Sequence, residues 1–174
     1  MRSLTLITTG GTIEKTYDEA TGQLLNRGSI VRRMLRRLRL EDTTVRIIEL
    51  MSKDSLLMTE DDRSRVVEAV HIAGGSRAMA TDAAGIVILH GTDTLTETGE
   101  RLFRDITDPR VPIVLSGAMR PYEMTRSDAL QNLTEALFAA GMLPPGVYCV
   151  AHGRALTFPG VVKDRDRGTF IGRA

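Results

Sequence analysis

The stretch GIVILHGTDT, residues 85–94, joins an apolar run to a polar cluster. The small and aliphatic residues 85–89 are typical of a strand buried on both faces of a parallel sheet. The polar residues follow at the carboxyl end of that strand, where open α/β sheets bind their ligands. Thr94, with Glu97 three residues later, has the pattern of a helix N-cap. The stretch therefore predicts a strand, a polar turn and a helix, in that order.

Strand-like and helical patterns alternate along the rest of the chain. Strands are expected over Leu4–Thr8, Val45–Met51, Ile113–Leu115 and Val147–Ala151, and helices over Ile30–Leu38, from Thr59 onward, over Leu95–Ile106 and over Ser127–Ala140. This alternation predicts a doubly wound α/β fold in one domain, 1–174, whose mostly parallel sheet has helices on both faces. Residues 13–28 and 152–174 lack clear periodicity and are expected to be irregular, the first as a functional lid.

The amino-acid composition of the chain argues against several classes of function. The 23 basic and 22 acidic residues give a net charge of +1, which offers no electrostatic case for nucleic acid or an anionic membrane. The single Cys149 excludes an intrachain disulfide and is expected to be buried and inert. The N-terminal apolar stretch is too short for a signal or a membrane span, so a cytoplasmic protein is expected.

One helix carries several arginines that interleave with its apolar stripe. They are Arg32, Arg33, Arg36, Arg37 and Arg39. We expect them on the solvent face rather than on a nucleic acid, because charge runs on amphipathic helices are usually solvated. No histidine spacing suggests a metal trio and no GxGxxG or GK[ST] motif is present, so no metal and no cofactor are expected.

Three more polar clusters follow predicted strands. They are Thr8–Ile13 (TTGGTI), Ser52–Asp54 (SKD) and Ser116–Pro121 (SGAMRP). Each has a purely structural alternative, since glycines and threonines also serve turns and caps, His90 also fits a structural role, and Arg120 also fits an interface contact. Because the carboxyl ends of parallel strands meet at one sheet edge, the four clusters together predict a site for a small polar molecule.

The motifs TTGGTI, HGTDT and SGAMRP, in this order, resemble the L-asparaginase family of the bacterial type I and type II class. The resemblance implies hydrolysis of L-asparagine to L-aspartate and ammonia through an acyl-enzyme on threonine. It implies that Thr12 is the nucleophile and that Tyr17 closes over it from the lid. It also implies that Thr92, Asp93 and Lys163 form the polar triad that manages the proton.

The same resemblance implies how the substrate is held. Ser52 would bind the α-carboxylate, Asp93 the α-ammonium and the carbonyl of Ala118 the leaving amide nitrogen. Amides near Gly11 and Thr92 are our candidates for binding the oxyanion of the tetrahedral intermediate.

The orientation of two groups of charged side chains near these residues affects how a substrate could bind. We expect Lys53 to point outward or to pair with an acid, because an inward lysine would oppose a substrate ammonium. Arg165 and Arg167, in the charge run beside Lys163, are expected to be solvated.

The resemblance also bears on size and partners. Family members are usually about twice as long, with a smaller C-terminal domain that supplies a glutamate to a neighbouring subunit, and this chain is expected to lack that domain and to form a homo-oligomer. Two other functions stay open: an amidase for glutamine or for a larger amide such as glutaminyl-tRNA, and a binding module for aspartate or asparagine without turnover.

Overall fold

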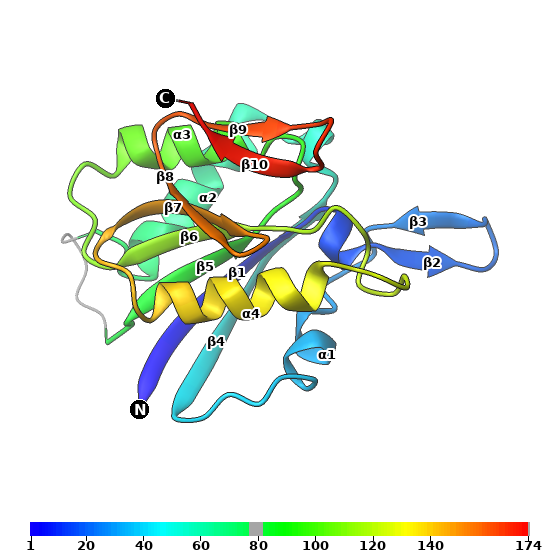
Figure 1. Ribbon diagram of the computed structural model, residues 1–174, viewed down its shortest axis with the longest axis horizontal. Helices are drawn as coiled ribbons and strands as arrows, with labels where there is room; N and C mark the ends of the chain where they lie inside the picture. The colour runs from blue at the N-terminus through cyan, green and yellow to red at the C-terminus, as the bar shows by residue number, and fades with distance from the viewer. Residues whose placement is uncertain (77–81, 174) are drawn as a thin grey trace.

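A six-stranded sheet forms the centre of the molecule, with strand order β4-β1-β5-β6-β7-β8 (Figure 1). The computed structural model describes residues 1–76 and 82–173. The sheet strands are β1 (Arg2–Gly10), β4 (Thr43–Lys53), β5 (Gly85–Leu89), β6 (Pro112–Ser116), β7 (Gly146–Ala151) and β8 (Arg154–Thr157). The first five pair in parallel, and β8 runs antiparallel to β7 at the edge. The predicted mostly parallel sheet is confirmed.

Helices cover both faces of this sheet, as the doubly wound prediction requires (Figure 1). They are α1 (Val31–Leu35) and α4 (Ala129–Ala140) on one face, and α2 (Glu60–Ile72) and α3 (Leu95–Asp105) on the other. Along β5, Ile86 and Ile88 enter the core under α2 and α3, whereas Val87 and Leu89 enter the core under α4. All four are fully buried, which is why this strand is an unbroken apolar run.

The arginine-rich helix α1 is shorter than expected. Val31 and Met34 are buried, and all five arginines of residues 32–39 are exposed, as predicted. The α-helix ends at Leu35 because the next amides turn back to nearer carbonyls, from Arg37 to Met34 and from Leu38 to Leu35.

The prediction of irregular structure at 13–28 and 152–174 was wrong. The first segment folds into a hairpin of β2 (Thr16–Asp18) and β3 (Gln23–Leu25), which projects beyond the carboxyl edge of the sheet (Figure 1). The second contains β8 and a hairpin of β9 (Val161–Asp164) and β10 (Thr169–Gly172). These strands have three or four residues each, too few for a periodic pattern to stand out.

Within residues 1–76 and 82–173, no helix is both long and apolar enough to cross a membrane. Cys149 is buried on β7, as predicted, and this burial raises the pKa of its thiol to about 12, which disfavours the reactive thiolate.

Candidate active site

The two threonine motifs touch through their glycines at the carboxyl edge of the sheet. A β-carbon on Gly11 would lie 2.4 Å from the backbone of Gly91, so only glycine permits this approach. Gly11 also has a φ of +79°, which L side chains rarely adopt. Thr12 and Thr92 each follow one of these two glycines, so the contact brings together threonines that are 80 positions apart in the sequence.

Thr12 opens a short 3-10 turn, Thr12–Glu14, directly after β1. It is half-buried, and its hydroxyl has no hydrogen-bond partner among the described residues. The turn is fixed from both sides, since the amide of Gly11 donates to the carbonyl of Lys53 at 2.8 Å and Asn26 donates to the carbonyl of Gly11 at 2.9 Å. The amide of Gly11 is therefore engaged with protein, which leaves Thr92 as the candidate oxyanion donor of the two.

Lys163 reaches this site from β9. Its ammonium donates to the hydroxyl of Thr92 at 2.8 Å and to a carboxylate oxygen of Asp93 at 2.8 Å. The structure thus joins the three residues of the predicted triad. Arg165 is solvated as expected, at 67% exposed, but it also donates to the same Asp93 oxygen at 2.8 Å.

The charges in this cluster define its chemistry. The hydrogen bond from Lys163, with Arg165 beside it, holds the pKa of Asp93 below its usual range despite partial burial. Asp93 is therefore a carboxylate near neutral pH, and it accepts from two cations through one oxygen. Its second oxygen has no partner among the described residues and can meet a cationic group of a substrate.

The end of β4 supplies Ser52 and Lys53, and Asp54 follows directly after the strand. Ser52 accepts from the amide of Gly28 at 3.1 Å, which leaves its own proton for another acceptor. Lys53 turns away and pairs with Asp62 of α2 at 2.7 Å, which confirms the predicted pairing with an acid. Asp54 pairs instead with Lys15, also at 2.7 Å, and this bond holds the pKa of Asp54 below its usual range.

Replacing Lys53 with alanine is expected to change KM for an amide substrate by less than tenfold. The reason is that its ammonium is bound to Asp62 rather than directed at the site. Because the buried Asp62 loses a charged partner, we expect the free energy of unfolding to fall by about 1 kcal/mol and Tm to fall by about 2–4 °C. Steady-state kinetics and thermal unfolding check the two expectations, and a tenfold or greater fall in KM would contradict the assigned orientation.

A partly buried polar network that sequence reasoning missed supports the loop after β6. Asp128 accepts from the amides of Met119 and Arg120 at 3.0 Å and from His152 at 2.8 Å. Asn132 donates to the carbonyl of Gly117 at 2.9 Å. These bonds hold the backbone on both sides of Ala118, whose carbonyl is the predicted contact of the leaving amide. The sequence offered no local signal, because His152 and Asp128 are 24 positions apart.

Tyr17 lies on β2 and is 59% exposed. Its hydroxyl lies 3.9 Å from the point where a β-carbon on Gly22, in the hairpin turn, would stand, and among the described residues no hydrogen bond joins it to Thr12. Its amide donates to Glu123 at 2.9 Å, and Glu123 is itself held by Arg33 at 2.9 Å. The hairpin is thus fastened to α1 and to the loop after β6, and the closure of Tyr17 over Thr12 stays a prediction.

His90 and Thr94 are structural residues of the HGTDT motif. His90 is fully buried between the carbonyl of Gly91 and the hydroxyl of Thr98, each at 2.8 Å, and this burial lowers its pKa to about 4. Thr94 is the N-cap residue of α3 and the helix begins after it, as predicted, but its hydroxyl donates to the carbonyl of Ser55 at 2.9 Å and caps no helical amide. Thr94 instead ties the loop after β4 to the loop after β5.

The free energy of unfolding is expected to stay nearly level between pH 4.5 and 6.5, because two buried groups oppose each other. The pKa of His90 falls from 6.5 to about 4, so the unfolded chain binds a proton first and stability is lost as pH falls through this range. Burial raises the pKa of Glu14 from 4.5 to about 7, so the folded chain keeps a proton longer and stability is lost as pH rises. Each effect is worth up to about 3 kcal/mol.

Urea unfolding of the His90→Gln variant checks this balance. Without His90, only the effect of Glu14 remains in this pH range. The free energy of unfolding of the variant is therefore expected to fall by about 2–3 kcal/mol as the pH rises from 4.5 to 7. A variant whose stability stays as level as that of the parent would contradict the expectation.

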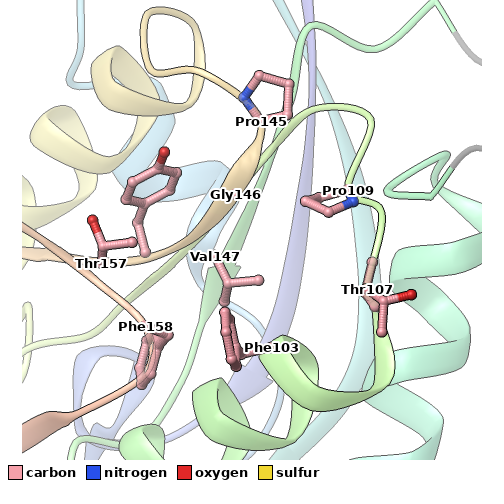
Figure 2. Close-up of a pocket in the computed structure, with 10 residues that line it drawn as sticks. Phe103, Thr107, Pro109, Pro145, Gly146, Val147, Thr157 and Phe158 are labelled. Carbon is pink, nitrogen blue, oxygen red and sulfur yellow. The ribbon is translucent and has the colours of Figure 1, made fainter.

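A separate apolar hollow lies at the opposite end of the sheet. Figure 2 shows Phe103, Val147 and Phe158 lining it, between the start of β7 and the end of α3, and its volume is about 320 Å³. The polar clusters gather at the carboxyl ends of the strands, so this hollow is not the candidate site. Among the described residues, no group of three or more histidine, cysteine, aspartate or glutamate side chains could hold a metal ion.

Comparison with known proteins identifies the family of this chain. The family model described as Asparaginase, N-terminal, matches residues 3–167, which is nearly the whole chain. The chain belongs to the asparaginase family. The resemblance carried by the three motifs is thereby confirmed at family level.

Two relatives in this family carry different names. The chain is 32% identical over 145 residues to an L-asparaginase of Thermococcus kodakarensis, and the match covers 83% of this chain and 42% of that protein. It is 30% identical over 161 residues to a Glutamyl-tRNA(Gln) amidotransferase subunit of Methanococcus vannielii, with 88% and 35% covered. The solved thermostable L-asparaginase of T. kodakarensis matches with a TM-score of 0.86 and 29% identity over 98% of this chain and 51% of that one. The chain spans about half or less of the length of these asparaginase-family relatives.

Proposed function

We propose that this chain hydrolyses L-asparagine to L-aspartate and ammonia through an acyl-enzyme on Thr12. The observation that carries the proposal is the position of Lys163, whose ammonium bridges Thr92 and Asp93 at 2.8 Å beside the Thr12 turn. Membership of the asparaginase family supports amide chemistry at this site.

In the proposed first step, the hydroxyl oxygen of Thr12 bonds to the amide carbon of the substrate. Its proton passes through the Thr92 hydroxyl to Lys163 in the neutral form, and Asp93 stabilises the ammonium that results. Arg165 donates to the same carboxylate at 2.8 Å and would help to hold Asp93 in place during this step. The proton then moves to the amide nitrogen, which leaves as ammonia, and water cleaves the ester to release aspartate and regenerate Thr12.

The proposed substrate contacts use groups with spare hydrogen-bonding capacity. Ser52 has a proton to donate to the α-carboxylate, and the second oxygen of Asp93 can accept from the α-ammonium. The held carbonyl of Ala118 would orient the amide nitrogen, and the amide of Thr92 would bind the oxyanion. Tyr17, carried on the hairpin, would close over Thr12 once the substrate is bound.

A second candidate is an amidase that works on glutamine or on a larger amide. The observation in its favour is the 30% identity to the Glutamyl-tRNA(Gln) amidotransferase subunit of M. vannielii. One methylene separates asparagine from glutamine and is worth only about 1–3 kcal/mol in a pocket.

The test is ammonia release by the purified chain with L-asparagine, L-glutamine and glutaminyl-tRNA in parallel, with the Thr12→Ala protein as the blank. We expect release from asparagine above the other two. Release from glutamine or from the charged tRNA alone would favour the second candidate. Binding of aspartate in calorimetry without ammonia from any substrate would show a binding module and overturn the proposal.

A further inference from the structure

Glu14 is a buried carboxyl group two residues after the proposed nucleophile. It is 1% exposed, and within residues 1–76 and 82–173 it forms no salt bridge. One of its oxygens accepts from the amide of Gly10 at 3.2 Å. The other accepts from the amide of Ile30 at 3.2 Å and from the hydroxyl of Ser29. Buried acids without a cationic partner are rare, so this one needs a specific explanation.

The three partners of Glu14 lie at the two ends of one segment. Gly10 ends β1 just before the Thr12 turn, while Ser29 and Ile30 follow the projecting hairpin. The carboxylate therefore closes the neck of the loop formed by residues 11–29. The loop carries Thr12, which lies only two residues beyond Gly10 at this neck.

We infer that Glu14 is a positioning residue, whose ionised carboxylate holds the neck of the 11–29 loop closed and so fixes the Thr12 hydroxyl for attack. The inference rests on the proposed function for its catalytic consequence. The closure of the neck itself does not depend on which substrate is used.

The ionisation of Glu14 makes the neck sensitive to pH. Burial raises the pKa of Glu14 to about 7, and the negative charge of Glu49 on β4 adds to the rise. Glu49 itself pairs with Arg32 at 3.5 Å, and Lys15, the residue after Glu14, pairs with Asp54 at 2.7 Å.

Protonation changes what the carboxyl group can accept. When the Glu14 oxygen near Ser29 is protonated, it can donate that proton to the Ser29 hydroxyl. The same oxygen is then a poorer acceptor for the amide of Ile30, which can only donate. The neck is therefore expected to loosen at Ile30 below pH 7 and to close above it.

Amide NMR on the whole chain tests the closure without any substrate. The proton shifts of the Gly10 and Ile30 amides are expected to titrate together with a midpoint near pH 7, and to lose this step in the Glu14→Gln variant. Ser29→Ala keeps the carboxyl but removes the hydroxyl that favours its ionised form, so the midpoint is expected to move to higher pH. Glu19→Gln, an exposed acid in the same hairpin, is the matched control and should leave the step unchanged.

Kinetics then test the positioning role. Glu14→Gln is expected to lower kcat about tenfold at pH 8, with a smaller loss at pH 6 and little change in KM. Two amides that do not titrate together between pH 5 and 9 would overturn the inference, and so would an unchanged pH–rate profile in Glu14→Gln. If the parent chain releases no ammonia, the proposed function fails, whereas the amide titration still decides whether Glu14 closes the neck.

Discussion

The Thr12→Ala variant is expected to release ammonia from asparagine at least about four orders of magnitude more slowly than the parent chain, because the acyl-enzyme cannot form without the hydroxyl. The fold should be unaffected, since Thr12 is half-buried and its hydroxyl has no partner among the described residues. Initial rates of ammonia release, measured beside Tm by calorimetry, check both expectations.

The matched control for this variant is Thr12→Ser, which keeps the nucleophilic oxygen and removes one methyl group. We expect it to retain at least about a tenth of the parent rate. Substantial turnover by Thr12→Ala would rule out the threonine mechanism, whereas equal loss in both variants would indicate that the turn, rather than the hydroxyl, had been damaged.

Lys163→Met is expected to lower kcat by about 10²–10⁴-fold, which is the usual contribution of general acid–base catalysis. The variant removes the only ammonium that donates to both Thr92 and Asp93 among the described residues. Asp93 keeps its bond to Arg165, so the carboxylate is not left unpaired and the fold should hold. Steady-state rates with asparagine measure the effect.

Two further variants separate the roles of charge and proton transfer. Lys163→Arg keeps the positive charge but cannot lose a proton near neutral pH, so it is expected to be nearly as slow as Lys163→Met. Arg165 also donates to Asp93 but forms no hydrogen bond with Thr92 among the described residues. Arg165→Met is therefore expected to lower kcat less than tenfold. Near-normal activity in Lys163→Arg would show that the lysine acts only through its charge.

The sequence predicted the central fold because the relevant signals are local. Residues 86–89 of β5 are apolar without interruption, since both faces of that strand are covered, and this pattern is visible in the chain itself. The hairpins β2–β3 and β9–β10 were missed because strands of three or four residues leave no periodic signature. Their pairing comes from contacts that the sequence pattern does not encode.

The residues of the candidate site also divide into those that local sequence signals indicated and those that only folding brings together. Thr12, Thr92 and Asp93 could be selected from glycine-rich motifs at strand ends, and Lys163, which lies on β9, from the resemblance to the family. Thr94 was correctly placed at the start of α3, but the partner of its hydroxyl was not predicted, because a hydroxyl at a helix start has two competing partners and only packing decides between them. Asp128 and His152 gave no signal, since they meet only after folding.

The sequence by itself determined the parallel sheet, the order of its loops and the family, because strand burial and glycine motifs are properties of short stretches of chain. Only the tertiary structure decided which charges meet: Lys163 donates to Thr92 and Asp93, Lys53 pairs with Asp62, and the buried Glu14 forms no salt bridge within residues 1–76 and 82–173. The physical reason is that ionisation depends on burial and on neighbours distant in sequence, and both exist only once the chain has packed.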